Sequence, residues 1–328
     1  MSSKIRVGIA GYGNLGRGVE LALSQNADME LVAVFTRRDP TAVNLFNQQV
    51  PVYDLAQIEQ HRAAIDVLIL CGGSKNDLPE QGPLLAQWFT TVDSFDTHAR
   101  IPEYYAAVDA SAQAAKTTAL IAVGWDPGLF SLNRVFGEAV LPQGETYTFW
   151  GKGLSQGHSD AVRRVPGVKG GVQYTLPIDA AVQRVRDGEQ PTLSTREKHR
   201  RQCFVVLAEG ADAEQVRQAI VTMPDYFADY DTEVNFIDAD TLARDHAAMP
   251  HGGFVIRSGQ SAAGTQQVVE YSLALGSNPE FTSSVLVAYA RAAFRLQRMG
   301  QYGAKTVFDV APGLLSARSA AELRKDYL

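Results

Sequence analysis

Three glycines near the amino terminus have a spacing that suits the binding of a dinucleotide. Gly11, Gly13 and Gly16 follow an apolar run and form a G-x-G-x-x-G pattern. The first glycine permits a tight turn, the second lets the backbone approach a pyrophosphate, and the third allows a helix to pack closely on a strand. The helix that follows would point its free N–H groups at the phosphates. We therefore predict a cofactor-binding turn, the alternative being a glycine-rich turn without a ligand. Its residues are Gly11, Tyr12, Gly13, Asn14, Leu15 and Gly16.

The residues after the second apolar run bear on which cofactor is bound. An NAD site has Asp or Glu about 20 residues beyond the glycines. This chain has Thr36, Arg37 and Arg38 at that place instead. A carboxylate would repel a 2′-phosphate, whereas a hydroxyl and two guanidiniums can bind it. The pattern favours NADP, the alternative being that both arginines are exposed loop charges.

Two carboxylates follow later strands of the same predicted sheet. Asp96 and Asp126 could hold a substrate ammonium at a hydride-transfer centre, and one of them could accept a proton. Their alternative role is structural, because Asp126 begins an Asp-Pro-Gly sequence that is typical of turns. The predicted cofactor-binding residues at these strand ends are Cys71, Gly72, Gly73, Ser74, Ser94, Phe95, Asp96, Val123, Gly124, Trp125, Asp126 and Pro127.

Other reactive side chains lack such a pattern. Cys71 has no evident partner base, so we interpret it as a packing residue rather than a nucleophile. His246 and His251 lie five residues apart, but they lack further ligands, and no metal site is predicted.

The composition narrows the class of protein. The chain has 328 residues and a net charge of −6 without a basic stripe, which argues against nucleic-acid binding. Its two cysteines, Cys71 and Cys203, form no disulfide framework and suit a reducing compartment. No signal-peptide pattern occurs, and the apolar runs are too short to span a bilayer. We expect a soluble, cytoplasmic protein without a membrane or nucleic-acid partner.

The first part of the chain alternates short apolar runs with amphipathic stretches. This alternation predicts a Rossmann-type, doubly wound parallel α/β sheet, with ligands at the carboxyl ends of the strands. The predicted strands are Ile5–Ala10, Leu31–Phe35, Val67–Cys71, Thr90–Asp93 and Ala119–Val123. The predicted helices or helical turns are Leu15–Ser24, Asp54–His61, Leu84–Phe89 and Ile101–Ala115.

The pattern changes after Gly128 and predicts a second, α+β lobe on a mixed or antiparallel sheet. We predict a dinucleotide-binding domain over residues 1–128 and a second domain over 129–274. A long helix over Asn278–Met299 is expected to begin the return of residues 275–328 to the first domain. A Gly-rich polar loop is expected after Trp150. The other elements predicted are strands at Tyr147–Trp150, Gln202–Ala208, Thr232–Ile237 and Gly253–Ile256, and helices at Phe130–Leu141, Ile178–Asp187 and Ala213–Thr222.

Longer strings resemble the meso-diaminopimelate D-dehydrogenases, in order, along nearly the whole chain. They are far more specific than a glycine pattern, and the differences lie in loops such as Arg38–Gln49 and at Thr36, where some relatives have Ser. The strings are Gly11–Gly16, Asp93–His98, Gly124–Gly128, Phe149–Gly151, Gly153–Asp160, Arg201–Phe204, Met223–Phe227 and Met249–Gly253.

The resemblance implies NADP-dependent, reversible oxidative deamination of meso-diaminopimelate at its D-carbon, within diaminopimelate and lysine biosynthesis. The implied products are L-2-amino-6-oxopimelate (tetrahydrodipicolinate) and ammonia. A homodimer is implied as well, with the second domain serving substrate binding and dimerisation. The implied contacts of the reacting D end are Asp96, Asp126, Trp150, Gln156 and Gly157. Those of the distant L end are Thr175, Arg201, His251 and Asn278.

Residue chemistry leaves other interpretations of some of these residues. Arg201 suits a bidentate grip on a carboxylate, but it also belongs to the basic run Lys198–Arg201 and could be a solvated charge. His251 could be a turn residue. The chemistry needs a base that takes a proton from the substrate ammonium and later activates water. Asp126 is the first candidate and His158 an alternative relay.

Two rival functions remain at this point. One is an NADP-dependent oxidoreductase acting on a sugar or on a broad range of D-amino acids. Such sugar enzymes usually have a Lys/His pair beside the nicotinamide, and no obvious pair follows the glycine-rich domain. The other is a non-catalytic NADP sensor, which predicts cofactor binding without NADPH formation.

Overall fold

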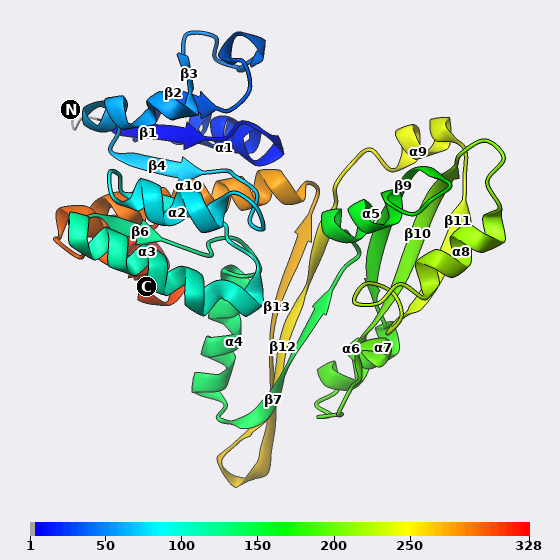
Figure 1. The fold of residues 1–328 in the computed structure, drawn as a ribbon. Helices are drawn as coiled ribbons and strands as arrows, with labels where there is room; N and C mark the ends of the chain where they lie inside the picture. The colour runs from blue at the N-terminus through cyan, green and yellow to red at the C-terminus, as the bar shows by residue number, and fades with distance from the viewer. Residues whose placement is uncertain (1–3) are drawn as a thin grey trace. The chain divides into compact units, whose positions relative to one another are not determined.

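The structure is a computed structural model that describes residues 4–328 (Figure 1). The chain divides into two compact units. Unit 1 comprises residues 1–132 and 279–328, and unit 2 comprises residues 133–278. The sequence placed these boundaries at 128 and 275, four residues earlier in each case. None of the helices within residues 4–328 is long and apolar enough to cross a membrane.

A seven-stranded sheet forms the centre of unit 1, and every pair of neighbouring strands is parallel. The predicted doubly wound sheet is therefore confirmed. Its order is β14-β6-β5-β4-β1-β2-β3, so the direction of winding reverses between β1 and β4, where such sheets bind ligands. The strands are β1 (Ile5–Ala10), β2 (Met29–Thr36), β3 (Val52–Asp54), β4 (Val67–Leu70), β5 (Thr91–Asp93), β6 (Thr118–Leu120) and β14 (Gly303–Lys305).

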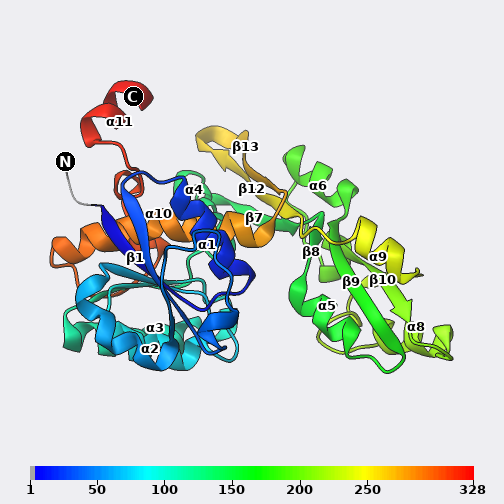
Figure 2. The same ribbon diagram turned by 90° about the horizontal axis from the view of Figure 1, so that it is seen from above.

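Helices cover both faces of this sheet (Figure 2). Alternate residues of β1 and β4 point to opposite faces, so Ile9 and Ile69 pack with α1 and α10, while Leu68 and Leu70 pack with α2 and α3. The α-helices are α1 (Asn14–Ser24), α2 (Leu78–Ala86), α3 (Ile101–Ala115), α4 (Leu129–Val140), which crosses the unit boundary, α10 (Asn278–Arg298) and α11 (Ala320–Tyr327). The 3-10 helices are η1 (Pro40–Ala42), η2 (Leu55–Ala64), η3 (His98–Arg100), η5 (Val307–Asp309) and η6 (Pro312–Leu314).

Three details of unit 1 differ from the sequence prediction. The helix expected at Leu84–Phe89 is α2, which starts six residues earlier with Pro79 in its first turn. Pro83 lies inside α2, where a proline is unexpected because it lacks the N–H of the helical ladder. The short edge strands β3 and β14 were not predicted, since three residues carry too little periodicity.

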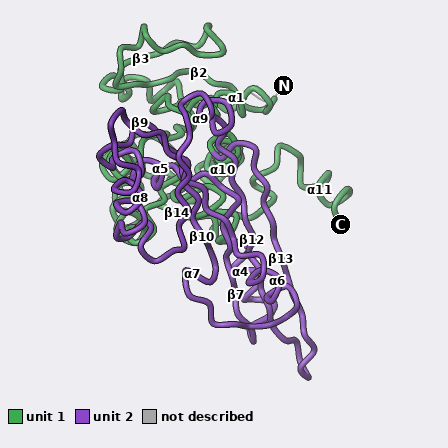
Figure 3. Tube along the Cα trace, turned by 90° about the vertical axis from the view of Figure 1, so that its right-hand side faces the viewer, with its two compact units in different colours: residues 1–132, 279–328 green, residues 133–278 purple. Residues whose placement is uncertain are grey.

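Unit 2 contains two sheets (purple in Figure 3). The four-stranded sheet has the order β11-β10-β9-β8 and is mixed, and the three-stranded sheet β13-β12-β7 is antiparallel. The strands are β7 (Gln143–Trp150), β8 (Gly153–Leu154), β9 (Val168–Pro177), β10 (His199–Leu207), β11 (Asp231–Phe236), β12 (His251–Ser261) and β13 (Thr265–Leu275). The helices are α5 (Gln156–Arg163), α6 (Asp179–Arg186), α7 (Thr195–Lys198), α8 (Ala213–Val221), α9 (Ala239–Asp245) and η4 (Ala262–Gly264).

The segment after Trp150 is not the polar loop that was expected, because it contains β8 and α5. Ser155 caps α5 by accepting a hydrogen bond from the backbone N–H of His158. The strands β9 and β13 were also missed. Two adjacent glycines interrupt β9, and nearly every residue of β13 is exposed, so neither strand shows an alternating apolar pattern.

Candidate active site

The glycine turn of unit 1 has the geometry of a phosphate cradle. Gly11 directly follows β1, has φ +97°, and its N–H donates to the Phe35 carbonyl. A Cβ on Gly16 would lie 2.3 Å from the Gly11 oxygen, so only glycine fits there. A Cβ on Gly13 would meet nothing within 4 Å, and α1 begins at the next residue. The backbone is thus open where a pyrophosphate would approach a helix N-terminus.

Of the two candidate arginines, Arg38 contacts this turn and Arg37 contacts the segment after β4. The guanidinium of Arg38 donates to the Tyr12 carbonyl, and its backbone N–H donates to Thr36 Oγ1 at 3.1 Å. Arg37 pairs with Asp77 at 2.8 Å but is 66% exposed, so this ion pair contributes at most about 1 kcal/mol. Two guanidiniums and a hydroxyl at the end of β2 fit a dinucleotide that carries a 2′-phosphate.

The turn after β4 is tied to the turn that carries Asp96. Ser74 Oγ accepts hydrogen bonds from the backbone N–H groups of Asp96 at 2.8 Å and of Thr97 at 3.2 Å. Burial raises the pKa of the Cys71 thiol, which therefore stays protonated. This agrees with a packing role for Cys71.

A tight turn presents Asp126. A Cβ on Gly128 would overlap the Gly124 oxygen, and the Leu129 N–H donates to that oxygen at 3.0 Å. The structural role suggested by Asp-Pro-Gly is therefore real. The turn also leaves the half-buried Asp126 at the carboxyl end of β6, beside β5, whose carboxyl end carries the exposed Asp96. The structural role of Asp126 in this turn therefore does not exclude a catalytic role.

In unit 2, three predicted substrate residues lie together, two on the four-stranded sheet and His251 at the start of β12 in the three-stranded sheet. Thr175 of β9 lies between Gly153 of β8 and Arg201 of β10 in the strand register. The Arg201 guanidinium donates to Thr175 Oγ1, and the His251 imidazole packs directly over Gly153. The two sheets thus bring together three of the residues that were predicted for the L end of the substrate.

Arg201 is not a solvated charge, although its place in a basic run suggested that alternative. It is only 7% exposed, and Tyr230 lies under its guanidinium at 3.8 Å. Its Nε has no hydrogen-bond partner, and among residues 4–328 no carboxylate forms an ion pair with it. Burial lowers the pKa of Arg201, but a guanidinium remains charged at physiological pH. A buried guanidinium that no described carboxylate neutralises is able to bind a carboxylate group.

Met249 connects other predicted residues of unit 2. Gln156 Nε2 donates to its sulfur at 3.1 Å, and the Asn278 N–H donates to its carbonyl at 2.9 Å. The Leu154 N–H donates to the carbonyl of the next residue, Pro250, at 2.9 Å. A Cβ on Gly157 would meet nothing within 4 Å, so that position is open.

His158 is the alternative candidate for the relay. Its Nδ1 lies 2.8 Å from Ser155 Oγ, and burial together with Arg201 lowers its pKa to about 4. Because a carboxyl group ordinarily has a pKa close to that value, basicity alone does not separate the two candidates. Asp126 stays the first candidate for the base because of its place at the carboxyl end of β6, beside the strand whose carboxyl end carries Asp96.

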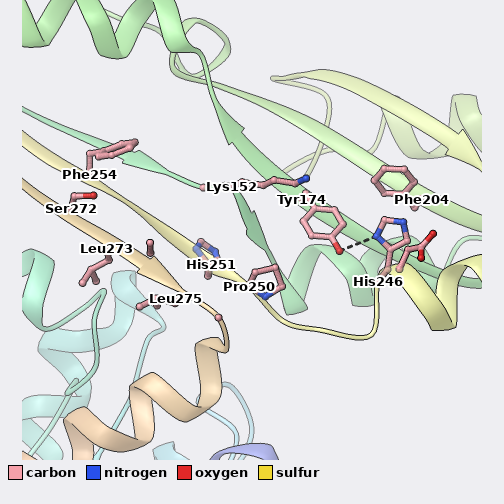
Figure 4. A pocket seen from close by; sticks show the side chains of 14 residues that line it. Lys152, Tyr174, Phe204, His246, Pro250, His251, Phe254, Ser272, Leu273 and Leu275 are labelled. Atoms are coloured by element: carbon pink, nitrogen blue, oxygen red, sulfur yellow. Dashed lines mark hydrogen bonds between the residues drawn. The ribbon is translucent and has the colours of Figure 1, made fainter.

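A cavity of about 630 Å³ lies in unit 2 (Figure 4). Tyr174 and Phe204 line it, and because side chains alternate along a strand they point to the face opposite Thr175 and Arg201. Of the predicted substrate residues only His251 borders this cavity. Its other lining residues include Lys152, Asp245, His246, Pro250, Phe254 and Ser272.

The alternative of a metal site at His246 and His251 gains no support from this cavity. His246 Nδ1 lies 3.0 Å from the Tyr174 hydroxyl, as the dashed line in Figure 4 marks. Within residues 4–328, no group of three or more His, Cys, Asp or Glu side chains could hold a metal ion.

His199 is a buried residue that no sequence motif singled out. Its Nε2 accepts the Trp150 N–H at 2.8 Å, and the two rings are stacked with centroids 5.3 Å apart. Burial and the neighbouring Arg201 and Lys198 lower its pKa to about 3. The only sequence signal was its adjacency to the Arg200-Arg201 pair.

The low pKa of His199 predicts a loss of stability in acid. The unfolded state, with a pKa of about 6.5, binds the proton that the folded state refuses, so stability falls as the pH drops below that value. Between pH 7 and about pH 4.5 we expect His199 to lower the free energy of unfolding by about 2–3 kcal/mol. His199→Gln keeps an acceptor for Trp150 and should flatten this acid loss in urea unfolding. The exposed control His98→Gln should leave the loss unchanged, and an equally steep loss in His199→Gln would contradict the prediction.

The parallel sheet with its glycine turn, basic strand end and strand-end carboxylates makes the chain a dinucleotide-dependent oxidoreductase. It is 67% identical over 326 residues to the meso-diaminopimelate D-dehydrogenase of Lysinibacillus sphaericus, covering 99% of this chain and 100% of that protein. The chain belongs to the meso-diaminopimelate D-dehydrogenase family, as its sequence motifs predicted.

A family model and solved structures agree with this assignment. The model of the diaminopimelic acid dehydrogenase C-terminal domain matches residues 124–277. A Clostridium tetani meso-diaminopimelate dehydrogenase mutant, crystallised with DAP, is 54% identical with a TM-score of 0.94. An engineered D-amino acid dehydrogenase bound to NADP⁺ is 47% identical with a TM-score of 0.87. Each alignment covers 99% of this chain and 100% of the other.

Proposed function

We propose that this protein catalyses the NADP⁺-dependent, reversible oxidative deamination of meso-diaminopimelate at its D-carbon. The products are L-2-amino-6-oxopimelate and ammonia, and the reverse direction serves diaminopimelate and lysine biosynthesis. The observation that carries the proposal is the buried Arg201. It has no anionic partner within residues 4–328, and it donates a hydrogen bond to Thr175. The relatives of this chain are named as dehydrogenases of meso-diaminopimelate, which is a dicarboxylic diamino acid.

Residues of unit 1 are proposed to bind the cofactor. NADP⁺, when bound, supplies the acceptor for the hydride. The glycine turn holds the pyrophosphate against the start of α1, and Thr36, Arg37 and Arg38 bind the 2′-phosphate. The turns after β4, β5 and β6 contribute the remaining residues, from Cys71–Ser74, Ser94–Asp96 and Val123–Pro127.

The L end of the substrate needs a donor for its carboxylate and an acceptor for its ammonium. Arg201 and Thr175 already share a hydrogen bond and can both turn donors toward a carboxylate. His251 and Asn278 complete the proposed set. Holding this end fixes which hydrogen of the distant D-carbon can leave, which is the proposed source of stereospecificity.

The C. tetani structure supports this set of residues. That variant has six replaced residues, a glutamine, a threonine, an arginine, a proline, a histidine and an asparagine. Six residues of this chain have the same types at the same intervals along the sequence. The C. tetani variant was crystallised with DAP. The six residues are Gln156, Thr175, Arg201, Pro250, His251 and Asn278.

At the reacting end, Asp96, Asp126, Trp150, Gln156 and Gly157 are proposed to contact the D-amino acid. The amine must lose a proton before its α-hydrogen can leave, and Asp126 accepts that proton. The carboxyl group then releases that proton to solvent. After the hydride has left, the Asp126 carboxylate takes a proton from the water that attacks the iminium carbon, and it passes this proton to the amino group of the carbinolamine. Ammonia leaves, the hydroxyl group loses its proton, and the carbon becomes a ketone carbonyl.

One assay tests the proposal against its rivals. Purified protein is incubated with NADP⁺ or NAD⁺ and with meso-, LL- or DD-diaminopimelate, and NADPH absorbance is followed. We expect NADPH with the meso isomer. Cofactor binding without any NADPH would support the sensor, and turnover of sugars or of unrelated D-amino acids in preference to meso-diaminopimelate would support the other rival.

Replacing both Arg37 and Arg38 by Ala should change the cofactor preference. Loss of the charge-assisted bonds to a 2′-phosphate should raise KM for NADP⁺ about 10²-fold, and KM for NAD⁺ by less than about threefold. Steady-state kinetics with both cofactors measures this. Arg244→Ala, which removes an exposed arginine paired with Asp245 in unit 2, is the matched control. Equal increases for the two cofactors would remove the assignment.

Unit 2 is proposed to bind substrate and to form a homodimer. Exposed apolar side chains on α4 (Val135, Phe136, Val140) and on β13 (Val268, Val269) support an interface on this unit. Light scattering should give twice the chain mass of 35.6 kDa, and a monomer mass would contradict the proposal.

A cytoplasmic location is also proposed. The free thiols of Cys71 and Cys203 support it, and cell fractionation tests it.

A further inference from the structure

A fully buried carboxylate lies beneath the two turns that carry the proposed reactive-end residues. Asp93 ends β5 and is 1% exposed. Its Oδ1 accepts the N–H of Phe95 at 2.9 Å and the N–H of Ala122 at 3.2 Å. The Asp93 carbonyl also accepts the Val123 N–H at 2.9 Å. One residue thus joins the turn before Asp96 to the turn before Asp126.

The second oxygen of this carboxylate is held from α3. Tyr104 is 4% exposed, and its hydroxyl donates to Asp93 Oδ2 at 2.6 Å. Its ring stacks on Phe95 with centroids 4.1 Å apart and an angle of 16°. A Cβ on Gly82 of α2 would overlap the Tyr104 hydroxyl, so the glycine provides the space for this contact. Four elements of unit 1 therefore converge on the Asp93–Tyr104 pair.

Burial of the Asp93 carboxylate costs free energy, and hydrogen bonds from the two turns offset this cost. A buried carboxylate needs several donors to offset its desolvation, and here two of its three are backbone N–H groups of turns rather than a basic side chain. Ala122 has φ +54°, a conformation uncommon for a residue other than glycine, and its N–H is one of those two donors. The carboxylate therefore holds a turn whose backbone the sequence would not otherwise favour.

We propose that Asp93 and Tyr104 form a positioning pair, which sets the placement of Asp96 and Asp126 relative to each other by holding the Phe95 and Ala122 turns on one carboxylate. Neither residue touches the substrate. The inference rests on the proposed function, because it assigns the pair to the geometry of the reacting end. A shift of about 1 Å at reacting groups can cost a hundredfold in rate even when its cause is remote.

The test compares two neighbouring tyrosines of α3. Tyr104→Phe removes the hydroxyl that holds Asp93 but keeps the ring on Phe95. Tyr105→Phe is the matched control, because its hydroxyl donates at 2.9 Å to the Ala304 carbonyl of β14, away from both turns. We expect Tyr104→Phe to lower kcat by about ten- to a hundredfold, with KM for NADP⁺ and KM for meso-diaminopimelate within about threefold of wild type. Tyr105→Phe should keep the wild-type kcat at a similar loss in Tm.

Asp93→Asn extends the test. An amide keeps one acceptor oxygen but points an N–H₂ group at one of the donors, so we expect a larger fall in kcat than in Tyr104→Phe. If Asp93→Asn fails to fold, Tyr104→Phe still decides the matter. Wild-type turnover together with an unchanged kcat in Tyr104→Phe would overturn the positioning role alone. Absence of NADPH from the wild-type protein would overturn the proposed function and the inference with it.

Discussion

Replacement of Asp126 by Asn is expected to lower kcat by about 10²–10⁴-fold, the range that a positioned acid or base contributes. The amide keeps the shape of the carboxylate and its place in the tight turn between Gly124 and Gly128. It cannot take the proton of the substrate ammonium. Stopped-flow or steady-state formation of NADPH measures kcat, and cofactor titration measures Kd for NADP⁺, which should stay within about twofold.

The comparison with Asp96→Asn separates the two carboxylates. Asp96 is exposed and is held at its backbone N–H by Ser74, so we expect its replacement to raise KM for meso-diaminopimelate more than it lowers kcat. A wild-type kcat in Asp126→Asn would eliminate the proposed base. His158, whose pKa burial and Arg201 lower to about 4, would then become the candidate acceptor.

Replacement of Arg201 by Met is the second large effect. Loss of a bidentate, charge-assisted contact with the L-end carboxylate should cost about 3–4 kcal/mol of binding, which raises KM for meso-diaminopimelate about 10²–10³-fold. The stability should not fall in parallel. Exchanging an unpaired buried charge for an apolar side chain of similar length is commonly neutral or stabilising.

The adjacent residue provides the control. Arg200 is exposed and lies on the opposite face of β10, so Arg200→Met should leave both KM and Tm near wild type. Kinetics and thermal unfolding of the two variants decide the question. A large loss of Tm in Arg201→Met with unchanged KM would show that the guanidinium serves the fold and not the substrate.

The nucleotide-binding part was predictable because its signals are local. The strand Ile5–Ala10, the glycine turn and the helix that follows occupy 20 contiguous residues, and each has its own periodicity or turn chemistry. Thr36, Arg37 and Arg38 could be placed by counting from the glycines. The structure confirms β1 as Ile5–Ala10 and α3 as Ile101–Ala115 at the predicted bounds.

Unit 2 was harder to predict from the sequence because its contacts are not local. Its two sheets are built from pairings such as Arg201 with Thr175, 26 residues away, and no local pattern specifies which strands meet. The burial of Arg201 depends on Tyr230 and on the strands around it, so the basic run Lys198–Arg201 left open whether its guanidinium holds a carboxylate or is solvated. Asp93 was passed over because a carboxylate at a strand end gives no sign of whether it faces solvent or the core.

The return of the chain to its first unit has a consequence for folding on the ribosome. Leu286, Tyr289 and Ala293 of α10 are buried in the same core as Val7 and Ile9 of β1, yet about 280 residues separate them in synthesis. The apolar clusters of unit 2 draw only on residues between 147 and 256. The emerging polypeptide can therefore complete its later unit first, while the part of the sheet face that α10 covers stays exposed beside α1 until the last fifty residues leave the exit tunnel. We expect chaperones that bind apolar surface to act on the nascent chain during this interval.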